Sequence, residues 1–196
     1  MFVALRFPKS VRTRVWDATS PLRCTDLSVR WAPMEQLHIT VRFLGDVAAP
    51  AVDEVDGRLA AAARDRGPFT LSLGGVGAFP SMKHPRVVWM GARPCAGITE
   101  LHRSVEAALE KCGFDPEGRP FRPHITLGRV RTPRRGEASP IDPRELARAA
   151  EAIGFRMDVH LTHLYLMRSR LGAGGAEHSV RGSYPLAGKP VLPTAS

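Results

Sequence analysis

The stretch EQLHITVRFLGDV, residues 35–47, places a histidine and a threonine two positions apart within an apolar run. Successive side chains of a β-strand point to opposite faces of the sheet. The polar side chains His38, Thr40 and Arg42 would therefore share one face, and the apolar side chains between and after them, Phe43 included, would share the other. Because an apolar face needs a core, the stretch predicts a half-buried strand whose polar face borders a wetter space.

A second phrase of the same kind occurs at residues 119–130, which read RPFRPHITLGRV. Here His124 and Thr126 share a face, and the aliphatic residues between and after them share the other. One such strand is more often structural than functional. Two copies change that balance, because strands lying side by side would bring two imidazoles and two hydroxyls to one cleft.

Two opposed imidazoles suit acid–base catalysis, because histidine changes its protonation state near neutral pH. A neutral ring can take a proton from water, and a protonated ring can donate one to a leaving oxygen. The threonine hydroxyls can donate hydrogen bonds to non-bridging phosphate oxygens. The two motifs therefore predict in-line phosphodiester cleavage, which needs mainly positioning and charge stabilisation.

Other kinds of site fit the sequence less well. A metal site would need three or four ligands, whereas each strand offers one histidine and no carboxylate two places away. We therefore expect neither a metal nor a cofactor. No G-x-S-x-G motif occurs and no cysteine lies near either phrase. A third H-x-T, at residues 160–162, reads as a coincidence within a C-terminal strand, and His102 and His178 are expected on the surface.

Two arginines are candidate phosphate ligands beside the motifs. Strict alternation puts Arg42 on the face of His38 and Thr40. The same rule turns Arg129, five places after His124, away from the site. A bulge or a strand end at the preceding glycine could nevertheless turn Arg129 inward.

The charge of the chain favours an anionic partner. Lysine and arginine number 28 and aspartate and glutamate 19, which leaves 28 − 19 = +9. Such an excess suits nucleic acid first, although dispersed arginines also simply keep a protein soluble. The densest basic run covers residues 129–135 and follows the second motif. It reads either as a solvated loop or as a rim that binds an RNA backbone.

The bulk composition indicates a folded protein of the cytoplasm. The chain has 196 residues, of which 43% are hydrophobic. No apolar run approaches the roughly 18 residues that span a bilayer, and the N-terminus lacks the pattern of a secretory signal. The three cysteines are odd in number and lack metal-type spacing, so a disulfide framework is not expected.

Periodicity predicts helices and strands in mixed order, without regular βαβ spacing. This order favours an α+β fold of mainly antiparallel sheets covered by helices. Ser10 is expected to cap the first helix and Asp142 the last. The predicted helices cover residues 10–20, 50–66, 98–112 and 142–154. The predicted strands cover residues 2–7, 26–31, 37–44, 69–80, 86–93, 122–130, 155–169 and 178–187.

The sequence resembles the 2H phosphoesterases, and within them the RNA 2′,3′-cyclic phosphodiesterases once called 2′-5′ RNA ligases. The resemblance spans residues 1–188 and leaves residues 189–196 as a loose tail. It rests on the phrases LHITVRFLG, GVGAFP, PRVVWMG, RPFRPHITLGR and LMRSRLGAGG with a later tyrosine. It implies a single bilobal α+β domain, two mainly antiparallel sheets facing a central cleft, helices on the outside and no metal.

The resemblance also implies an activity and a role for each site residue. The activity is hydrolysis of a terminal RNA 2′,3′-cyclic phosphate to a 2′-phosphomonoester. By this likeness His38 protonates the leaving 3′-oxygen and His124 activates water. Thr40 and Thr126 hold the phosphate, and Arg129 matches a family arginine beside it. Arg42 falls where the family varies.

Several alternatives stay open at the level of sequence. Family members also join tRNA halves through a 2′-5′ linkage, so tRNA fragments are possible partners, as are nucleoside 2′,3′-cyclic phosphates. Another 2H activity, on 2′-5′ oligonucleotides or a cyclic nucleotide-sugar phosphate, is the nearest alternative. A module that binds RNA ends without turnover is the alternative outside enzymes. A monomer suffices for a cleft formed within one chain.

Overall fold

The computed structural model describes residues 1–25, 27–131, 141–172 and 175–189. These residues form an α+β fold, as the sequence predicts. The strands are β1 Phe2–Arg6, β2 Val29–Trp31, β3 His38–Phe43, β4 Phe69–Pro80, β5 Pro85–Ala92, β6 His124–Val130, β7 Arg156–Leu161, β8 His163–Gly172 and β9 Gly175–Pro185. The helices are α1 Lys9–Ala18, α2 Ser20–Arg23, α3 Ala49–Arg64, α4 Ala96–Glu110 and α5 Pro143–Glu151, with a 3₁₀ turn at Met34–Gln36.

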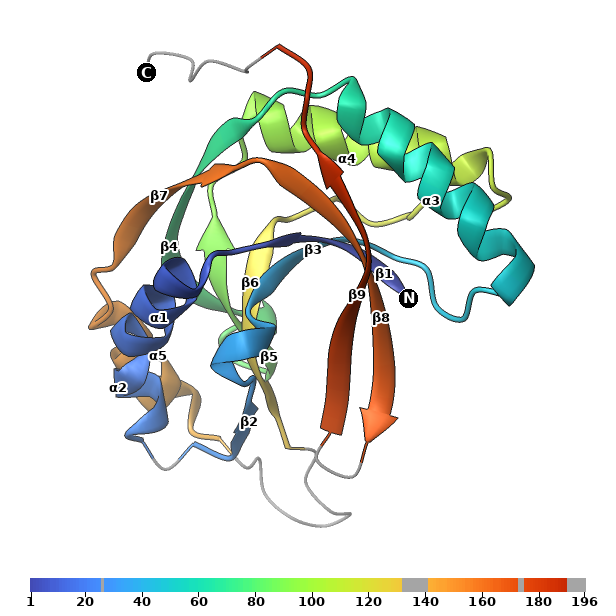
Figure 1. Ribbon diagram of the computed structural model, residues 1–196. Helices are drawn as coiled ribbons and strands as arrows, with labels where there is room; N and C mark the ends of the chain where they lie inside the picture. The colour runs from blue at the N-terminus through green and yellow to red at the C-terminus, as the bar shows by residue number, and fades with distance from the viewer. Residues whose placement is uncertain (26, 132–140, 173–174, 190–196) are drawn as a thin grey trace.

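The strands form one antiparallel sheet with the two motif strands at its centre (Figure 1). The order is β7-β4-β5-β6-β3-β1-β8-β9, and β2 pairs with β6 beside this path. Strands β3 and β6 meet at a single paired position, Ile39 with Ile125. The two halves that the sequence predicts as facing sheets are therefore continuous through this one pair.

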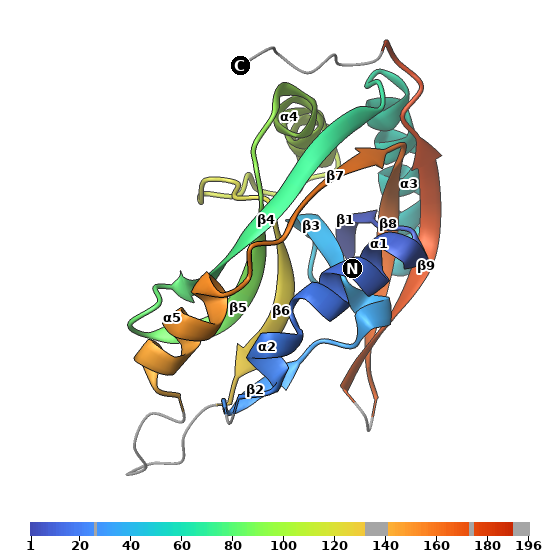
Figure 2. The ribbon, with the colours of Figure 1, turned by 90° about the vertical axis from the view of Figure 1, so that its left-hand side faces the viewer.

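The helices pack on the outside of the two halves of the sheet. Figures 1 and 2 place α3 and α4 toward one end of the molecule and α2 and α5 toward the other. Helix α3 contacts β8, β9 and α4, whereas α5 contacts β4 and α2. The described helices are all too short or too polar to cross a membrane.

The apolar faces of both motif strands enter the main core. Ile39 and Ile125 are fully buried, and Val41 and Leu127 are at most 3% exposed. Each fully buried aliphatic side chain contributes about 1.5–3 kcal/mol relative to an exposed one. This burial fixes the strands from behind and leaves the histidine and threonine faces free to form a site.

Strand β3 contains a bulge that breaks its alternation. The partner strand β1 pairs with Thr40 and then with Arg42, so Val41 has no opposite residue. An extra residue shifts every later side chain to the other face. Arg42 therefore leaves the face of His38 and Thr40, contrary to the prediction, and Phe43 joins it. Phe43 is 60% exposed and is no core residue.

Strand β6 contains the corresponding bulge. Its partner β5 pairs with Thr126 and then with Gly128, so Leu127 has no opposite residue. The shift brings Arg129 onto the face of His124 and Thr126, as expected if the strand bulges at Gly128. In each motif strand the third residue after the threonine therefore lies on the face of the histidine. This residue is Phe43 in β3 and Arg129 in β6.

Two local predictions are wrong in detail. Helix α1 begins at Lys9 with Pro8 in the cap position, so Ser10 is not its N-cap. The predicted strand 155–169 is two strands, because the chain passes at Thr162 from β4, the partner of β7, to β1, the partner of β8. Asp142 caps α5 as expected and accepts a hydrogen bond from the backbone N–H of Arg144 at 2.8 Å.

Two glycine substitutions test the packing around the second bulge. A Cβ on Gly128 would lie 2.5 Å from Val29 Cγ1 and 3.0 Å from the carbonyl oxygen of Arg30. A Cβ on Gly57, inside α3, meets nothing within 4 Å. We expect Gly128→Ala to lower the free energy of unfolding by about 1–3 kcal/mol through overpacking. Gly57→Ala should raise it by up to about 1 kcal/mol through helix propensity.

Urea denaturation of both variants measures these changes. Equal stabilities of Gly128→Ala and the wild type would mean that β2 does not pack tightly across the bulge.

Candidate active site

A pocket of about 410 Å³ lies along the motif strands on their polar face. His124, Thr40 and Thr126 line it, together with Arg129. His38 stands at its border, because its Nε2 lies 3.1 Å from Thr40 Oγ1. Both motifs therefore contribute to one site, as the sequence predicts.

The pairing of Ile39 with Ile125 sets the relative position of the four polar side chains. In an antiparallel pair, residues one step to either side of a paired position also lie opposite each other. His38 thus lies opposite Thr126, and Thr40 lies opposite His124. Each histidine faces the threonine of the other motif, which gives the site an approximate two-fold symmetry.

Both imidazoles are oriented in the same way. The Nδ1 atom of His38 lies 2.6 Å from the carbonyl oxygen of Gln36, two residues earlier. The Nδ1 atom of His124 lies 2.7 Å from the carbonyl oxygen of Arg122, also two residues earlier. A carbonyl can only accept, so each Nδ1 carries the hydrogen. The Nε2 atom of each ring is therefore the one without a hydrogen, and that of His38 accepts a hydrogen bond from the Thr40 hydroxyl.

The environment of the site lowers the pKa of both histidines. Burial lowers the pKa of His38 to about 4, and the cation Arg6 and the two other nearby histidines add to the effect. Burial also lowers the pKa of His124, and the charge of Arg129 acts in the same direction. These lowered pKa values favour the neutral form of both rings at pH 7.

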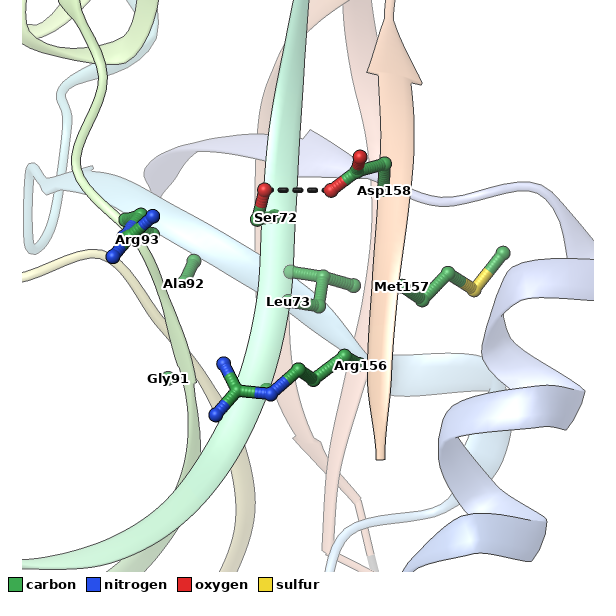
Figure 3. Close-up of a pocket in the computed structure, with 9 residues that line it drawn as sticks. Ser72, Leu73, Gly91, Ala92, Arg93, Arg156, Met157 and Asp158 are labelled. Atoms are coloured by element: carbon green, nitrogen blue, oxygen red, sulfur yellow. Dashed lines mark hydrogen bonds between the residues drawn. The ribbon is translucent and has the colours of Figure 1, made fainter. Parts of the chain in front are cut away.

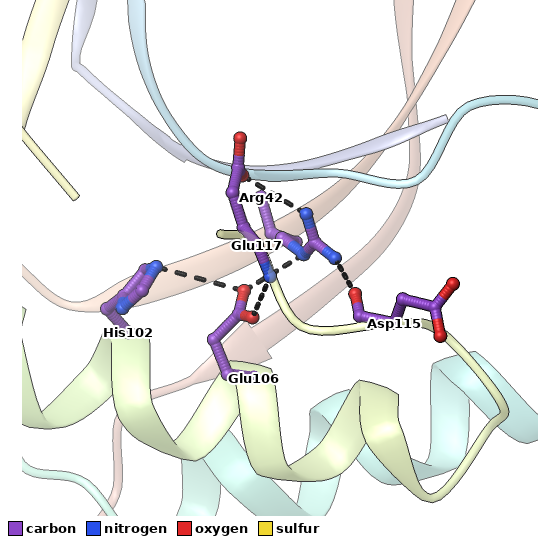
Figure 4. A network of polar contacts seen from close by, with 5 residues as sticks. All are labelled: Arg42, His102, Glu106, Asp115 and Glu117. Carbon is purple, nitrogen blue, oxygen red and sulfur yellow. Dashed lines mark hydrogen bonds and ion pairs between the residues drawn. The ribbon is translucent and has the colours of Figure 1, made fainter. Parts of the chain in front are cut away.

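Arg42 is held in a network of polar contacts on the α4 side of β3 (Figure 4). Its Nε lies 2.9 Å from Glu106 Oε1 on α4. Its Nη1 donates to Glu117 Oε2 at 3.1 Å, and its Nη2 donates to the carbonyl oxygen of Asp115. Glu106 also accepts a hydrogen bond from the backbone N–H of Glu117 at 3.1 Å. Although Arg42 borders the pocket, its guanidinium already donates to two acceptors and forms an ion pair with Glu106.

Two histidines expected on the surface lie beside the site instead. The ring of His178, from β9, lies 5.4 Å from that of His38 and 5.0 Å from that of Phe2. Gln36 Nε2 donates to the carbonyl oxygen of Ala176 at 2.7 Å and ties β9 to this corner. His102, on α4, stacks on Phe121 with ring centroids 4.2 Å apart. No spacing in the sequence relates these residues to the motifs.

Aromatic rings surround the second motif. The ring of Phe79 lies 5.0 Å from that of His124 and 5.2 Å from that of Trp89. Phe79 and Phe121 both line the pocket. The pocket thus combines apolar walls with histidine, threonine and arginine, a composition suited to a nucleoside attached to a phosphate.

Within the described residues no group of three or more histidine, cysteine, aspartate or glutamate side chains is placed to hold a metal ion. Of the basic run 129–135, residues 129–131 are described and Arg134 and Arg135 lie outside the described residues. Whether this run is a loop or an RNA-binding rim stays a prediction.

The chain matches a family model and several curated proteins. The model of the 2′-5′ RNA ligase superfamily matches residues 8–173. A protein of Methanothermobacter thermautotrophicus named RNA 2′,3′-cyclic phosphodiesterase is 34% identical over 68% of this chain and 72% of its own length. A protein of Archaeoglobus fulgidus with the same name is 37% identical over 67% of this chain and 72% of its own length.

Solved structures share the whole fold. A crystal structure from Thermus thermophilus covers 96% of this chain and 98% of its own, with a TM-score of 0.78 and 25% identity. The crystal structure of Escherichia coli LigT complexed with 3′-AMP covers 94% of this chain and 96% of its own, with a TM-score of 0.74 and 25% identity. With its paired H-x-T-x strands and these matches, the chain belongs to the 2′-5′ RNA ligase superfamily of 2H phosphoesterases.

Proposed function

We propose that this protein hydrolyses the 2′,3′-cyclic phosphate at the end of an RNA to a 2′-phosphomonoester. The observation that carries the proposal is the pairing of two H-x-T-x strands at Ile39 and Ile125, which sets two oriented imidazoles around one pocket. The names of the relatives support the same substrate. Tetrahedral phosphorus attacked in line requires a base on one side and an acid on the other, which two opposed histidines provide.

In the proposed reaction His124 removes a proton from water as the water oxygen attacks phosphorus. The bond from phosphorus to the 3′-oxygen breaks, and His38 gives its proton to that oxygen. The products are a free 3′-hydroxyl and a 2′-phosphate, and the proton taken up by His124 replaces the one lost by His38 through solvent. Ligation of tRNA halves would use the 5′-hydroxyl of a second RNA in place of water. This hydroxyl gives its proton to His124 and attacks phosphorus, the bond to the 3′-oxygen breaks with a proton from His38, and a 2′-5′ linkage forms.

Thr40, Thr126 and Arg129 are the proposed ligands of the non-bridging phosphate oxygens. All three line the pocket, and the bulge after Thr126 supports the inward position of Arg129. A phosphate contact from Arg42 stays a prediction, because such a contact would compete with Glu106, Glu117 and Asp115. The network favours a positioning role for Arg42 toward the segment that leads into His124.

Single substitutions of the two histidines test the catalytic roles. We expect His38→Ala and His124→Ala each to lower kcat about 10²–10⁴-fold on RNA ending in a 2′,3′-cyclic phosphate, because each removes one proton-transfer group. A substrate whose leaving 3′-oxygen is replaced by sulfur needs no proton on departure. This substrate should therefore raise the kcat of His38→Ala far more than the kcat of His124→Ala.

Product analysis and an assay in excess EDTA complete this test, and His178→Ala serves as the control for a neighbouring imidazole. Full activity in both histidine variants, loss of activity on chelation, or a 3′-phosphate product would each contradict the proposal. If the protein binds RNA ends tightly but does not hydrolyse them, it is an RNA-binding module and not a phosphodiesterase.

The pH dependence of kcat/KM tests the environment of the histidines. The reaction needs one neutral and one protonated ring, and kcat/KM reports the pKa values of the free enzyme. Because burial lowers both pKa values, that of His38 to about 4, we expect a bell-shaped profile centred below pH 6.5. The kcat profile should lie at higher pH, since bound phosphate favours the protonated rings. A kcat/KM that still rises between pH 6.5 and 8 would contradict this environment.

A double-mutant cycle separates the two roles of Arg42. If Arg42 positions the segment around Glu117, Arg42→Ala should destabilise the protein by about 1–3 kcal/mol. The loss of unfolding free energy in Arg42→Ala and the loss in the double variant Glu106→Gln/Glu117→Gln should then not be additive when the substitutions are combined. If Arg42 binds phosphate, Arg42→Ala should raise KM while the glutamate variant leaves KM unchanged. Urea denaturation and steady-state kinetics of the three variants distinguish these results.

A further inference from the structure

A second pocket, of about 550 Å³, lies where β5, β4 and β7 run side by side (Figure 3). Glycines form part of its floor, at positions 74 and 91. Arg93, Arg156 and Asp158 stand around it. It shares no lining residue with the pocket of the two motifs.

Strand register places this pocket on the same face of the sheet as His124. Gly91 on β5 is paired with His124, and paired residues point to the same face. On the next strands Gly74 is paired with Arg156, and Ser72 with Asp158. The buried residue between them, Leu73, points to the core, so its two neighbours point to the face of the site.

Neither glycine places a side chain of its own between His124 and Arg156. At Gly91 the ring of Trp89 lies close by, 3.3 Å from where a Cβ would be. Gly91 adds no side chain beside the imidazole, and the stem of Arg156 crosses the backbone of Gly74. A Cβ on Gly74 would lie 3.4 Å from Arg156 Cγ. Strands β6, β5, β4 and β7 span three spacings of about 4.8 Å, or roughly 14 Å between backbones. The arginine side chain reaches back across part of that distance (Figure 3).

Two exposed arginines line the pocket. Arg93 follows the end of β5, and Arg156 extends from β7 across β4 (Figure 3). Neither has an ion-pair partner among the residues that the structure describes, in contrast to Arg42 and Arg66. Unpaired guanidinium groups converging on one pocket suit an RNA phosphate or the face of a base.

A carboxylate at the edge of the pocket narrows the choice of ligand. Ser72 Oγ donates to Asp158 Oδ1 at 2.6 Å, which holds the carboxylate in place. A carboxylate repels a free phosphate ion, but it accepts hydrogen bonds from the amino or imino groups of a base. Two arginines with one fixed carboxylate therefore fit a whole nucleotide better than an isolated anion.

We infer that this second pocket binds the nucleotide that precedes the cyclic-phosphate end of an RNA strand. The inference rests on the proposed function, in which the terminal nucleoside and its cyclic phosphate occupy the pocket of the motifs. The strand would then continue past His124 and Trp89 to Arg93 and Arg156. The true substrate class is an oligonucleotide, and a mononucleotide uses only part of the surface.

Kinetics on two substrates test this inference. One is a nucleoside 2′,3′-cyclic phosphate, and the other is a trinucleotide that ends in the same group. The wild type should show a higher kcat/KM on the trinucleotide. Arg93→Ala/Arg156→Ala should lower kcat/KM on the trinucleotide by about tenfold or more, mainly through KM. The same variant should keep its activity on the mononucleotide, and its salt slope on the trinucleotide should fall by about 1.

The charge-matched control is Arg14→Ala/Arg64→Ala, which removes two exposed arginines from α1 and α3. This control should behave as the wild type on both substrates. An equal loss on both substrates would place the terminal nucleotide in this pocket and overturn the inference. No loss on either substrate, or an equal loss in the control, would overturn it as well.

A binding measurement keeps the inference separate from the proposed activity. Fluorescence anisotropy would follow a labelled trinucleotide with a terminal 2′-phosphate, and the unlabelled nucleoside 2′-phosphate would be measured by calorimetry. Arg93→Ala/Arg156→Ala should weaken binding of the trinucleotide alone. If this difference holds while no hydrolysis is found, the proposed function fails and the RNA-binding pocket stands. If the trinucleotide binds the variant and the wild type equally, the pocket is no RNA site.

Discussion

The pairing of Ile39 with Ile125 is the constraint on which the site depends. Both side chains are fully buried, so their hydrophobic contacts hold β3 and β6 together where the two halves of the sheet meet. The histidines and threonines of both motifs, and Arg129, all lie within a few residues of this pair. A shift of either strand by one residue would turn its imidazole into the core and bring its isoleucine into the pocket. Core packing and the arrangement of the polar side chains are therefore two consequences of the same register.

The bulges after the two threonines explain why the halves of the site differ although the motifs agree. Each bulge turns the third residue after the threonine toward the pocket. In the second half this residue is Arg129, a cation. In the first half it is Phe43, an apolar side chain, and the cation one place earlier is turned toward α4. The approximate two-fold symmetry of the backbone thus carries an asymmetric distribution of charge, as expected when a substrate has a phosphate on one side and a base on the other.

Burial has a different consequence for each kind of side chain in the site. The apolar neighbours Phe2 and Phe79 exclude water from the histidines, which lowers the pKa values of both rings. A lowered pKa favours the neutral form of both rings. Arg93 and Arg156 are exposed. The face of the sheet thus carries buried histidines in one part and exposed arginines in another.

The sequence by itself determined the fold class, most of the helices and strands, and the two motifs. It could do so because alternation and helical periodicity are local properties, and because the repetition of H-I-T marks two strands as equivalent. It also identified Gly128 as a position where alternation could break. It could not reveal that a second bulge follows Thr40, since Val41 and Arg42 carry no local signal of one.

Only the tertiary structure decided which residues from elsewhere complete the site. His178 reaches His38 through the pairing of β8 with β9, and Glu106 reaches Arg42 through the packing of α4. The pocket of Arg93 and Arg156 depends on the register of β5, β4 and β7, which no spacing in the sequence expresses. Local sequence patterns fix which way a side chain points along its own strand. The neighbours that it meets are set by long-range pairing, and that pairing follows from burial of the whole core.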